Sequence, residues 1–376
     1  MARPSLSERD AERIYLQQIR PDHFDESVRS ATPTAVLIGG QPGAGKAYAL
    51  ARVQAHLTAS VGPSVAVSAD LLREYHPQWR QALPSDLRAY DAIRPDIGRW
   101  YVRLTADAIA AGLNVVLVST MRDLRGVHAL SMQLRAASYQ LSAVVLATDR
   151  DQSRQATLAR YDLARAAGLT PAFVPGAVHD SAYAELRDVL GQLESAHLVD
   201  RLQVVARDGR QLYANHWDAE RWAREPKAVA VLDDYRERRK TARELADAVL
   251  RWQTLATRLA TDPGVPREVA SLATAWGQEA ASRIEQDTEA ARLVRWGKEA
   301  EAFRTLPRTQ FEREFPQHTK ALERLDEAIR FAGKDIALEA DRERFVAQSR
   351  ARIAERIAEG RYTTAERVKE REAKAR

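Results

Sequence analysis

The sequence contains no cysteine, which excludes disulfide bonds and thiolate metal sites. No uninterrupted apolar run approaches the ~20 residues that a membrane-spanning helix needs, and the first ten residues carry no apolar segment of the signal-peptide kind. These absences fit a reducing compartment. We therefore expect a cytoplasmic protein that has no membrane partner.

A strong excess of one charge is also absent. Lys and Arg together number 57 and Asp and Glu 52, which leaves a formal net charge of only +5. This mild bias suits an anionic partner such as a nucleotide, whereas a dedicated nucleic-acid surface would be more one-sidedly basic. We expect no nucleic-acid partner. With 376 residues, 45% of them hydrophobic, the chain is long enough for two domains.

The pattern of the chain changes near Pro226. Before that point, short runs rich in Val, Ile and Leu alternate with helical stretches, which predicts βαβ units and a mainly parallel sheet. The residues from Ser7 to Asp10 approximate a capping box that opens a helix through Gln18. The five expected strands are Ala35–Ile38, Val65–Ser68, Asn114–Val118, Ser142–Ala147 and Leu202–Val205.

After Pro226 the sequence shows only helical periodicity, so we expect an all-α region over residues 226–376. Breaks are expected at Asp262-Pro263-Gly264, near Pro307 and around Gly333. Three tryptophans, Trp252, Trp276 and Trp296, lie among Leu and Ala at helical spacing, and such residues are usually core. The charged stretch 361–376 is expected to be a solvated helix end or tail.

A phosphate-binding motif follows the first expected strand. Residues Gly40 to Lys46 fit G-x-x-x-x-G-K and precede the helical Tyr48–Leu57. Glycines let such a loop turn its amides inward, and the helix N-terminus adds positive potential where phosphate lies. We therefore predict that ATP or GTP binds here. The candidate nucleotide-binding residues are Gly40, Gln41, Pro42, Gly43, Ala44, Gly45, Lys46 and Ala47.

One position of this motif is unusual. The motif has Ser or Thr after the lysine, and its hydroxyl binds Mg²⁺, but here the residue is Ala47. Mg²⁺ is still expected with the nucleotide, although the sequence provides no assignable metal ligand. Either phosphates, water and another side chain hold the ion, or the site binds nucleotide without turning it over.

Several segments occur in the order found in the zeta toxins, the P-loop kinases of bacterial toxin–antitoxin pairs. The segments that resemble the family are Gly39–Lys46, Ser68–Pro77, Asn114–Asp123, Arg160-Tyr161 and His179-Asp180. The resemblance covers roughly Ala11 to Asn215. It implies an α/β fold of the P-loop kinase type, with a mainly parallel sheet flanked by helices, filling residues 1–225. The family's core does not include the residues after about Trp222, so residues 226–376 are expected to form a helical extension.

The resemblance also implies an activity. Zeta toxins use ATP to phosphorylate a hydroxyl of a UDP-activated amino sugar of the UDP-N-acetylglucosamine type, and an antitoxin protein opposes them. Carried over to this sequence, the implied catalytic residues are Lys46, Asp70 and Arg160. The implied substrate-binding residues are Arg73, Thr120 and Arg122.

For most of these residues a second interpretation stays open. Asp70 could take the proton of an attacking hydroxyl, or it could cap the helical Leu71–Tyr75. Arg160 belongs to a run of arginines, Arg150, Arg154, Arg160 and Arg165, and the sequence does not decide which of them faces the site. Arg73 and Arg122 could instead form surface ion pairs with Glu74 or Asp123, and Thr120 could be a cap.

Three positions depart from the family pattern. Ala47 lacks the magnesium-binding hydroxyl, Val118 stands where the family has a substrate-binding glutamate, and Ala172 stands where it has a second lid arginine. These departures favour an alternative function: a catalytically degenerate nucleotide-binding protein whose helical half engages a protein partner.

Overall fold

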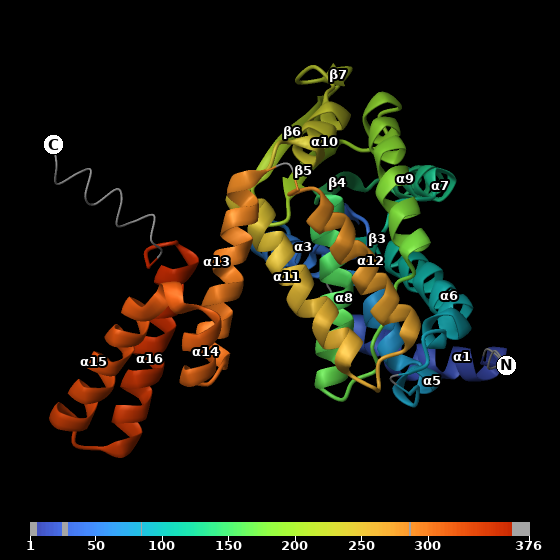
Figure 1. The fold of residues 1–376 in the computed structure, drawn as a ribbon. Helices are drawn as coiled ribbons and strands as arrows, with labels where there is room; N and C mark the ends of the chain where they lie inside the picture. Colours follow the sequence, from blue (N-terminus) through green and yellow to red (C-terminus); the bar gives the residue numbers. More distant parts are fainter. Residues whose placement is uncertain (1–5, 25–28, 84, 286, 363–376) are drawn as a thin grey trace. The chain divides into compact units, whose positions relative to one another are not determined.

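The computed structural model describes residues 6–24, 29–83, 85–285 and 287–362 (Figure 1). The chain forms two compact units. The α/β unit comprises Met1–Arg238 and Arg258–Thr274, and the helical unit comprises Arg239–Thr257 and Ala275–Arg376.

A seven-stranded sheet forms the centre of the α/β unit, in the order β2-β3-β1-β4-β5-β6-β7. The strands are β1 (Thr34–Gly39), β2 (Ser64–Ser68), β3 (Asn114–Ser119), β4 (Gln140–Ala147), β5 (Arg201–Ala206), β6 (Gln211–Asp218) and β7 (Arg221–Trp222). The first five are parallel and confirm the predicted strands. The antiparallel edge formed by β6 and β7 was not predicted from the sequence.

Helices pack on both faces of this sheet (Figure 1). One face carries α6 (Ala89–Ala110), α7 (Leu124–Ala136), α9 (Gly176–Ser195) and α10 (Ala228–Glu237). The P-loop helix α3 (Lys46–Ser60) covers β1, β2 and β3 on the other face. The predicted α/β fold is thereby confirmed, and its parallel strands all end at the edge where such folds bind ligands.

The N-terminal segment begins as expected but continues further. The hydroxyl of Ser7 accepts a hydrogen bond from the backbone N–H of Asp10 and caps α1 (Glu8–Ile14). Helical backbone then runs past Gln18, through the π-helical turn η1 (Tyr15–Ile19) and α2 (Arg20–Phe24).

Helix α10 is part of the α/β core although it follows Pro226. Ala228 and Leu232 are fully buried in the cluster that contains the sheet residues. The carboxylate of Glu194 on α9 accepts the backbone N–H of Ala228 at 2.9 Å. Because that carboxylate satisfies a free amide at the start of α10, the helix is fixed at its first turn. The expected domain bounds, 1–225 and 226–376, stay a prediction.

The remaining helices confirm the predicted all-α C-terminal region, and no strand occurs among the described residues after Trp222. They are α11 (Ala242–Thr261), α12 (Arg267–Ser282), α13 (Thr288–Thr305), α14 (Arg308–Glu314), η3 (Pro316–His318), α15 (Thr319–Asp335) and α16 (Glu339–Ala358). The expected breaks are confirmed: α11 ends before Asp262, α13 ends before Pro307, and α15 ends at Asp335, two residues after Gly333. The part of the expected tail at 363–376 lies outside the described residues.

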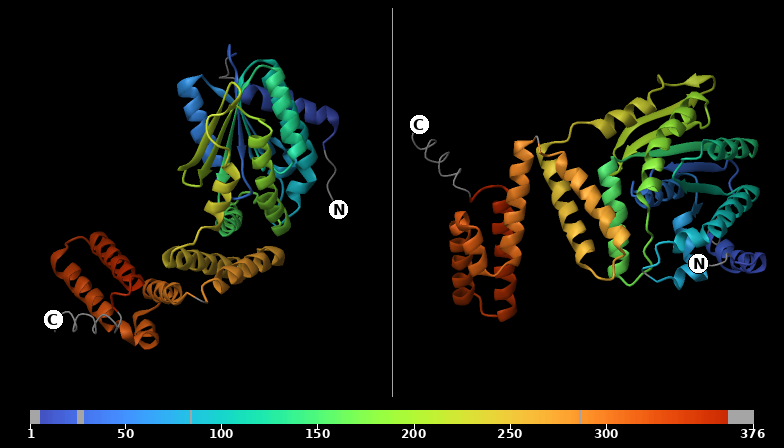
Figure 2. Two further views of the ribbon diagram at one scale, coloured as in Figure 1. Left: turned by 90° about the horizontal axis from the view of Figure 1, so that it is seen from above. Right: turned by 45° about the vertical axis from the view of Figure 1, so that its right-hand side comes forward.

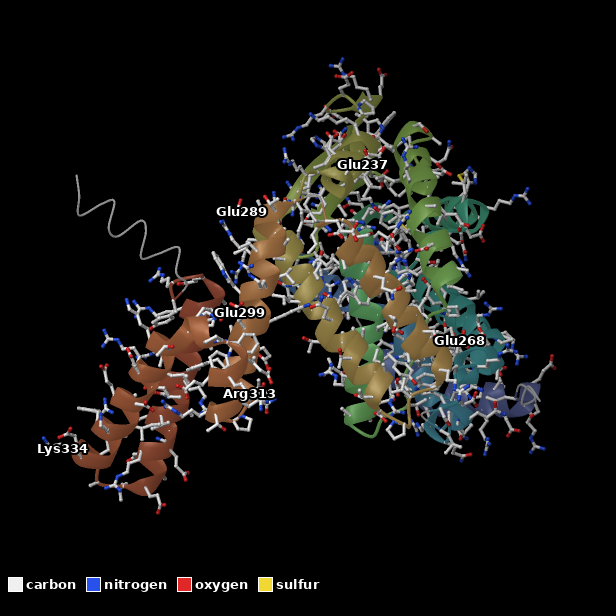
Figure 3. All side chains as sticks on the ribbon, in the orientation of Figure 1. Glu237, Glu268, Glu289, Glu299, Arg313 and Lys334 are labelled. Atoms are coloured by element: carbon white, nitrogen blue, oxygen red, sulfur yellow. The ribbon has the colours of Figure 1, made fainter. Side chains whose placement is uncertain are left out.

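Within the helical unit, α16 packs beside α13 and α15 (Figure 2). Trp252 and Trp276 are buried with ring centres 6.2 Å apart, so these two tryptophans are core. Glu299, labelled in Figure 3, accepts a hydrogen bond from the buried His318 ring at 2.8 Å. In the described part of the chain, no helix combines the length and apolar character required to cross a membrane.

Candidate nucleotide and phosphoryl-transfer site

The phosphate-binding loop connects β1 to α3 and passes over the first turn of α8 (Arg150–Ala166). Gly43 and Gly45 have φ angles of 77° and 104°, which L-residues with a side chain rarely adopt. A Cβ on Gly43 would lie 2.0 Å from the carbonyl oxygen of Ser153. Only glycine fits this position, and the close contact fixes the loop against α8.

Lys46 begins α3 and its side chain folds back over the loop. Its Nζ donates hydrogen bonds to the carbonyl oxygens of Gly40 at 2.7 Å and Gln41 at 3.1 Å. Burial lowers the pKa of Lys46 to about 8, an effect that the charge of Asp70 opposes and that of Arg160 reinforces. At neutral pH the ammonium is therefore charged, yet near its titration range.

Asp70 lies in α4 (Ala69–Leu72), directly after β2, and the structure tests the interpretation of this residue as a helix cap. The cap of α4 is Ser68, whose hydroxyl accepts the backbone N–H of Asp70 at 3.3 Å. The capping interpretation of Asp70 is therefore wrong. The Asp70 carboxylate instead accepts hydrogen bonds from Arg73 at 2.6 Å and from Arg160 at 3.4 Å.

The charge state of Asp70 follows from these neighbours. Burial alone would raise its pKa, but the charges of Arg73, Arg160 and Lys46 outweigh burial and hold the pKa below its usual range. Asp70 is consequently a carboxylate at neutral pH and accepts hydrogen bonds only. It is a weak base in the resting protein, because the adjacent cations stabilise its charged form.

The four arginines of α8 contact different partners, which the sequence did not decide. Arg160 is the one that faces Asp70. Arg154 pairs with Asp180, Arg165 pairs with Asp262, and Arg150 lies 4.9 Å from the centre of the Tyr183 ring. Lys46, Asp70 and Arg160 thus come together from three separate segments.

Of the three implied substrate residues, Arg73 lies nearest to Asp70. Arg73 also pairs with Glu74 at 3.1 Å, as its alternative interpretation expected, and its guanidinium lies 4.9 Å from the Trp79 ring centre. Thr120 is half-buried and Arg122 is exposed, in the segment after β3, the strand beside β2. Among the described residues Arg122 forms no ion pair with Asp123.

Two of the three positions that depart from the family pattern are apolar and packed. Val118 is buried in the cluster beneath α3, and Ala172 is half-buried against the main core. Neither side chain offers a polar atom. That the family's polar functions are missing at these positions stays a prediction.

A buried polar network behind the loop was not predicted. The side-chain amide of Gln41 donates to the carbonyl of Thr148 at 2.8 Å and to Ser153 Oγ at 3.1 Å. Ser153 Oγ lies 2.9 Å from His179 Nε2, and His179 Nδ1 lies 2.9 Å from Asp180. Ser153 has no solvent exposure, so this Ser–His–Asp arrangement ties the loop to α8 and α9 and is closed to a substrate.

Two further arginines contact the loop and were also missed. Arg207, the first residue after β5, donates a hydrogen bond to the carbonyl of Gly43. Arg236 of α10 donates to Gln41 Oε1 at 3.3 Å and to the carbonyl of Tyr183 at 3.0 Å. Arg207 could have been found, because it follows an expected strand at the ligand-binding edge of the sheet. Nothing in the sequence signals Arg236.

The residues at this site fit nucleotide phosphates but do not complete a protein site for Mg²⁺. Loop amides, a helix N-terminus and Lys46 converge on one point, as phosphate binding requires. Ala47 is exposed at the metal-binding position of the motif and has no donor atom. In the described ranges, no group of three or more His, Asp or Glu side chains could hold a metal ion.

Sequence and structure comparisons with known proteins indicate the same fold as the site geometry. The parallel sheet and its phosphate-binding loop define a P-loop kinase-type fold. The zeta toxin family model matches residues 21–218, just over half of the chain. The chain belongs to the zeta toxin family, a family of P-loop kinases.

Individual relatives are distant in sequence. The toxin zeta of Enterococcus hirae is 25% identical over 202 residues, which are 52% of this chain and 69% of that protein. Toxin PezT of Streptococcus pneumoniae is 25% identical over 188 residues, 49% of this chain and 72% of that protein. A solved chain from the PezAT toxin–antitoxin system of S. pneumoniae superposes with a TM-score of 0.55 at 21% identity, covering 66% of this chain and 98% of that one.

Proposed function

We propose that this protein transfers the terminal phosphoryl group of ATP or GTP to a hydroxyl of a small molecule. The substrate class that we propose is a UDP-activated amino sugar of the UDP-N-acetylglucosamine type. One observation carries the proposal: the Asp70 carboxylate lies between Arg160 and Arg73, beside Lys46, at the sheet edge that borders the phosphate loop. A carboxylate next to two phosphate-seeking cations is what a kinase needs to direct a hydroxyl at phosphorus.

The proposed reaction is an in-line displacement. Loop amides and Lys46 hold the β- and γ-phosphates, while Asp70 accepts a hydrogen bond from the substrate hydroxyl and aims its lone pair at the γ-phosphorus. As the new O–P bond forms, the bond from phosphorus to the β,γ-bridging oxygen breaks and the nucleoside diphosphate leaves with that electron pair. Asp70 receives the hydroxyl proton late, because its low pKa makes orientation its larger contribution.

Arg160 supplies positive charge to the phosphoryl group in transit. Its guanidinium reaches the Asp70 carboxylate at 3.4 Å, so it lies beside the oxygen that attacks. A planar guanidinium matches the equatorial oxygens of the transferring group. We assign substrate contacts to Arg73, Thr120 and Arg122, which follow the adjacent strands β2 and β3.

Membership of the zeta toxin family supports a role as a toxin that an antitoxin protein opposes. PezT is named as a toxin, and PezAT as a toxin–antitoxin system. The partner that we propose for this chain is therefore an antitoxin.

The direct test is incubation with γ-labelled ATP or GTP and a panel of UDP-sugars and dinucleotides, with products read by mass spectrometry. We expect one phosphate to be added to the UDP-amino sugar, and at least about a hundredfold less product when Asp70→Asn replaces the wild type. Nucleotide binding without any phosphorylated product would reject the kinase.

That result would favour the alternative, a degenerate nucleotide-binding protein whose helical unit engages a partner. Ala47, Val118 and Ala172 are the observations in its support, since each lacks a polar group that the family pattern provides.

A further inference from the structure

Two arginines that contact the phosphate loop form no ion pair among the described residues. Arg207 and Arg236 are half-buried, and each donates a hydrogen bond to the loop, the first to the Gly43 carbonyl and the second to Gln41 Oε1. The side chain of Arg207 also passes Gly45, where an added Cβ would lie 3.4 Å from Arg207 Cγ. In the described part of the chain, neither guanidinium has an acidic group within ion-pair distance. Burial lowers the pKa of Arg207, and the charge of Asp149, farther away, opposes that effect only in part.

Other buried arginines of the same unit are paired. The side chains of Arg73, Arg154 and Arg165 are 15%, 6% and 15% exposed, and each forms an ion pair with an aspartate. Proteins pair buried charges in this way because an isolated buried charge is costly. Arg207 and Arg236 are exceptions that lie side by side with the phosphate loop, which points to an anion as their missing partner.

The surroundings of Arg236 support this reading. The guanidinium lies 3.9 Å from the Tyr183 ring centre, its Nε is buried without a hydrogen-bond partner, and Arg150 lies 4.9 Å from the same ring. Burial lowers the pKa of Arg236, an effect that Tyr183 and Asp233 oppose and Arg150 reinforces. An arginine side chain stays protonated in proteins despite such a shift. Arg150 and Arg236 therefore repel each other across the Tyr183 ring, and a bound anion would lower that repulsion.

We propose that Arg207 and Arg236 supply the positive charge that a loop-held Mg²⁺ would supply in a P-loop with Ser or Thr after its lysine. Two guanidiniums carry the formal charge of one Mg²⁺ ion, and Ala47 has no oxygen with which to hold that ion. The chain therefore binds a nucleoside triphosphate with little dependence on a divalent metal. This inference rests on the proposed nucleotide binding. Arg236 lies on α10, whose last residue Glu237 is labelled in Figure 3, beyond the family match that ends at residue 218.

The experiment is calorimetric titration of the full-length protein with the β,γ-imido analogue of ATP, once with MgCl₂ and once with EDTA. For the wild type we expect the two dissociation constants to agree within about tenfold. Arg207→Gln and Arg236→Gln should each weaken binding in EDTA by about 10- to 100-fold, the range of a hydrogen bond to a charged group. Arg210→Gln is the matched control: it removes an exposed arginine on the same hairpin, whose guanidinium lies over the Tyr235 ring, and should leave binding unchanged.

A charge-preserving variant separates electrostatics from packing. Arg207→Lys keeps the positive charge and should retain most of the binding in EDTA, with melting temperatures checking that all variants are folded. The inference is overturned if EDTA weakens wild-type binding more than tenfold, if Arg207→Gln and Arg236→Gln bind like Arg210→Gln, or if Arg207→Lys is as weak as Arg207→Gln. A wild type that binds no nucleotide in either buffer rejects the proposed function itself.

Discussion

The arginines on the two sides of the phosphate loop differ in whether they form ion pairs. On the β2 side, Asp70 balances Arg73 and Arg160, so the cations are paired within the protein. On the β5 and α10 side, Arg207 and Arg236 contact the loop and form no ion pair with any acidic residue that the structure describes. In the proposed reaction, Asp70 can release its contact with an arginine to bind the substrate hydroxyl. The arginine is then free to bind the phosphoryl group in transit. An unpaired arginine is suited to holding an anion that stays in place.

The largest effect should come from breaking the paired side. Asp70→Asn removes the carboxylate that orients the hydroxyl, so phosphoryl transfer should fall by about 10²–10⁴-fold. Nucleotide affinity should hardly change, and stability should shift by no more than about 1 kcal/mol, since exposed ion pairs contribute little. Kinase assays, calorimetry and thermal melts measure the three quantities. Retained specific activity in the folded mutant would remove Asp70 from the mechanism.

Lys46→Ala tests the loop itself. Removal of the ammonium should weaken nucleotide binding by about 1.5–3 kcal/mol, or about 10- to 100-fold, because a hydrogen bond to a charged group is lost. Calorimetry on the folded variant measures the change. Equal affinity of mutant and wild type would mean that phosphates do not bind at Gly40–Lys46.

The same lysine predicts a pH dependence. Its pKa of about 8 in the free protein means that the ammonium loses its proton above that pH, whereas bound phosphate requires the charged form. Affinity should therefore be constant up to about pH 7.5 and fall about tenfold by pH 9. The nucleotide affinity of Lys46→Arg should not change with pH over this range, because an arginine stays charged. A wild-type profile as flat as that of the arginine variant would contradict the assignment.

The smallest effect should come from restoring the metal ligand. Ala47→Thr adds a hydroxyl at the start of α3, so Mg²⁺ should tighten nucleotide binding or raise turnover by a few-fold, within the worth of one hydrogen bond. Ala51→Thr, at an exposed site further along the same helix, controls for the lower helix propensity of Thr. If both variants respond to Mg²⁺ like the wild type, the ion is held by groups other than the loop.

Much of the fold could be predicted because buried parallel strands are read directly from runs of Val, Ile and Leu. The β6 strand was missed because polar residues such as Asn215 and His216 interrupt it. Asp208-Gly209, with Gly209 at φ 86°, is a strong hairpin signal that would have revealed it. At the ligand-binding edge of the sheet, Ser68 lies two residues before Asp70, and its preference for the cap position would have argued against Asp70 as the cap.

The tertiary contacts of the site could not be predicted from the sequence. At about 100° per residue, Arg150, Arg154 and Arg165 lie within about 60° of one another on the helix and Arg160 lies about 80° from Arg150. Only the packed neighbours decide which of them meets Asp70. The contact of Arg236 with Gln41 joins segments that no local pattern relates. Such tertiary contacts depend on how α9 and α10 pack.

That last contact spans 195 residues of sequence, which has a consequence for the order in which the protein is made. At typical synthesis rates of roughly 5–20 residues per second, Arg236 leaves the ribosome about 10–40 s after Gln41. In a nascent chain, Lys46 and the loop glycines are therefore synthesised long before Arg236, whose guanidinium donates a hydrogen bond to the loop. Ribosome-bound chains stopped before and after α10 has emerged should therefore differ in nucleotide retention.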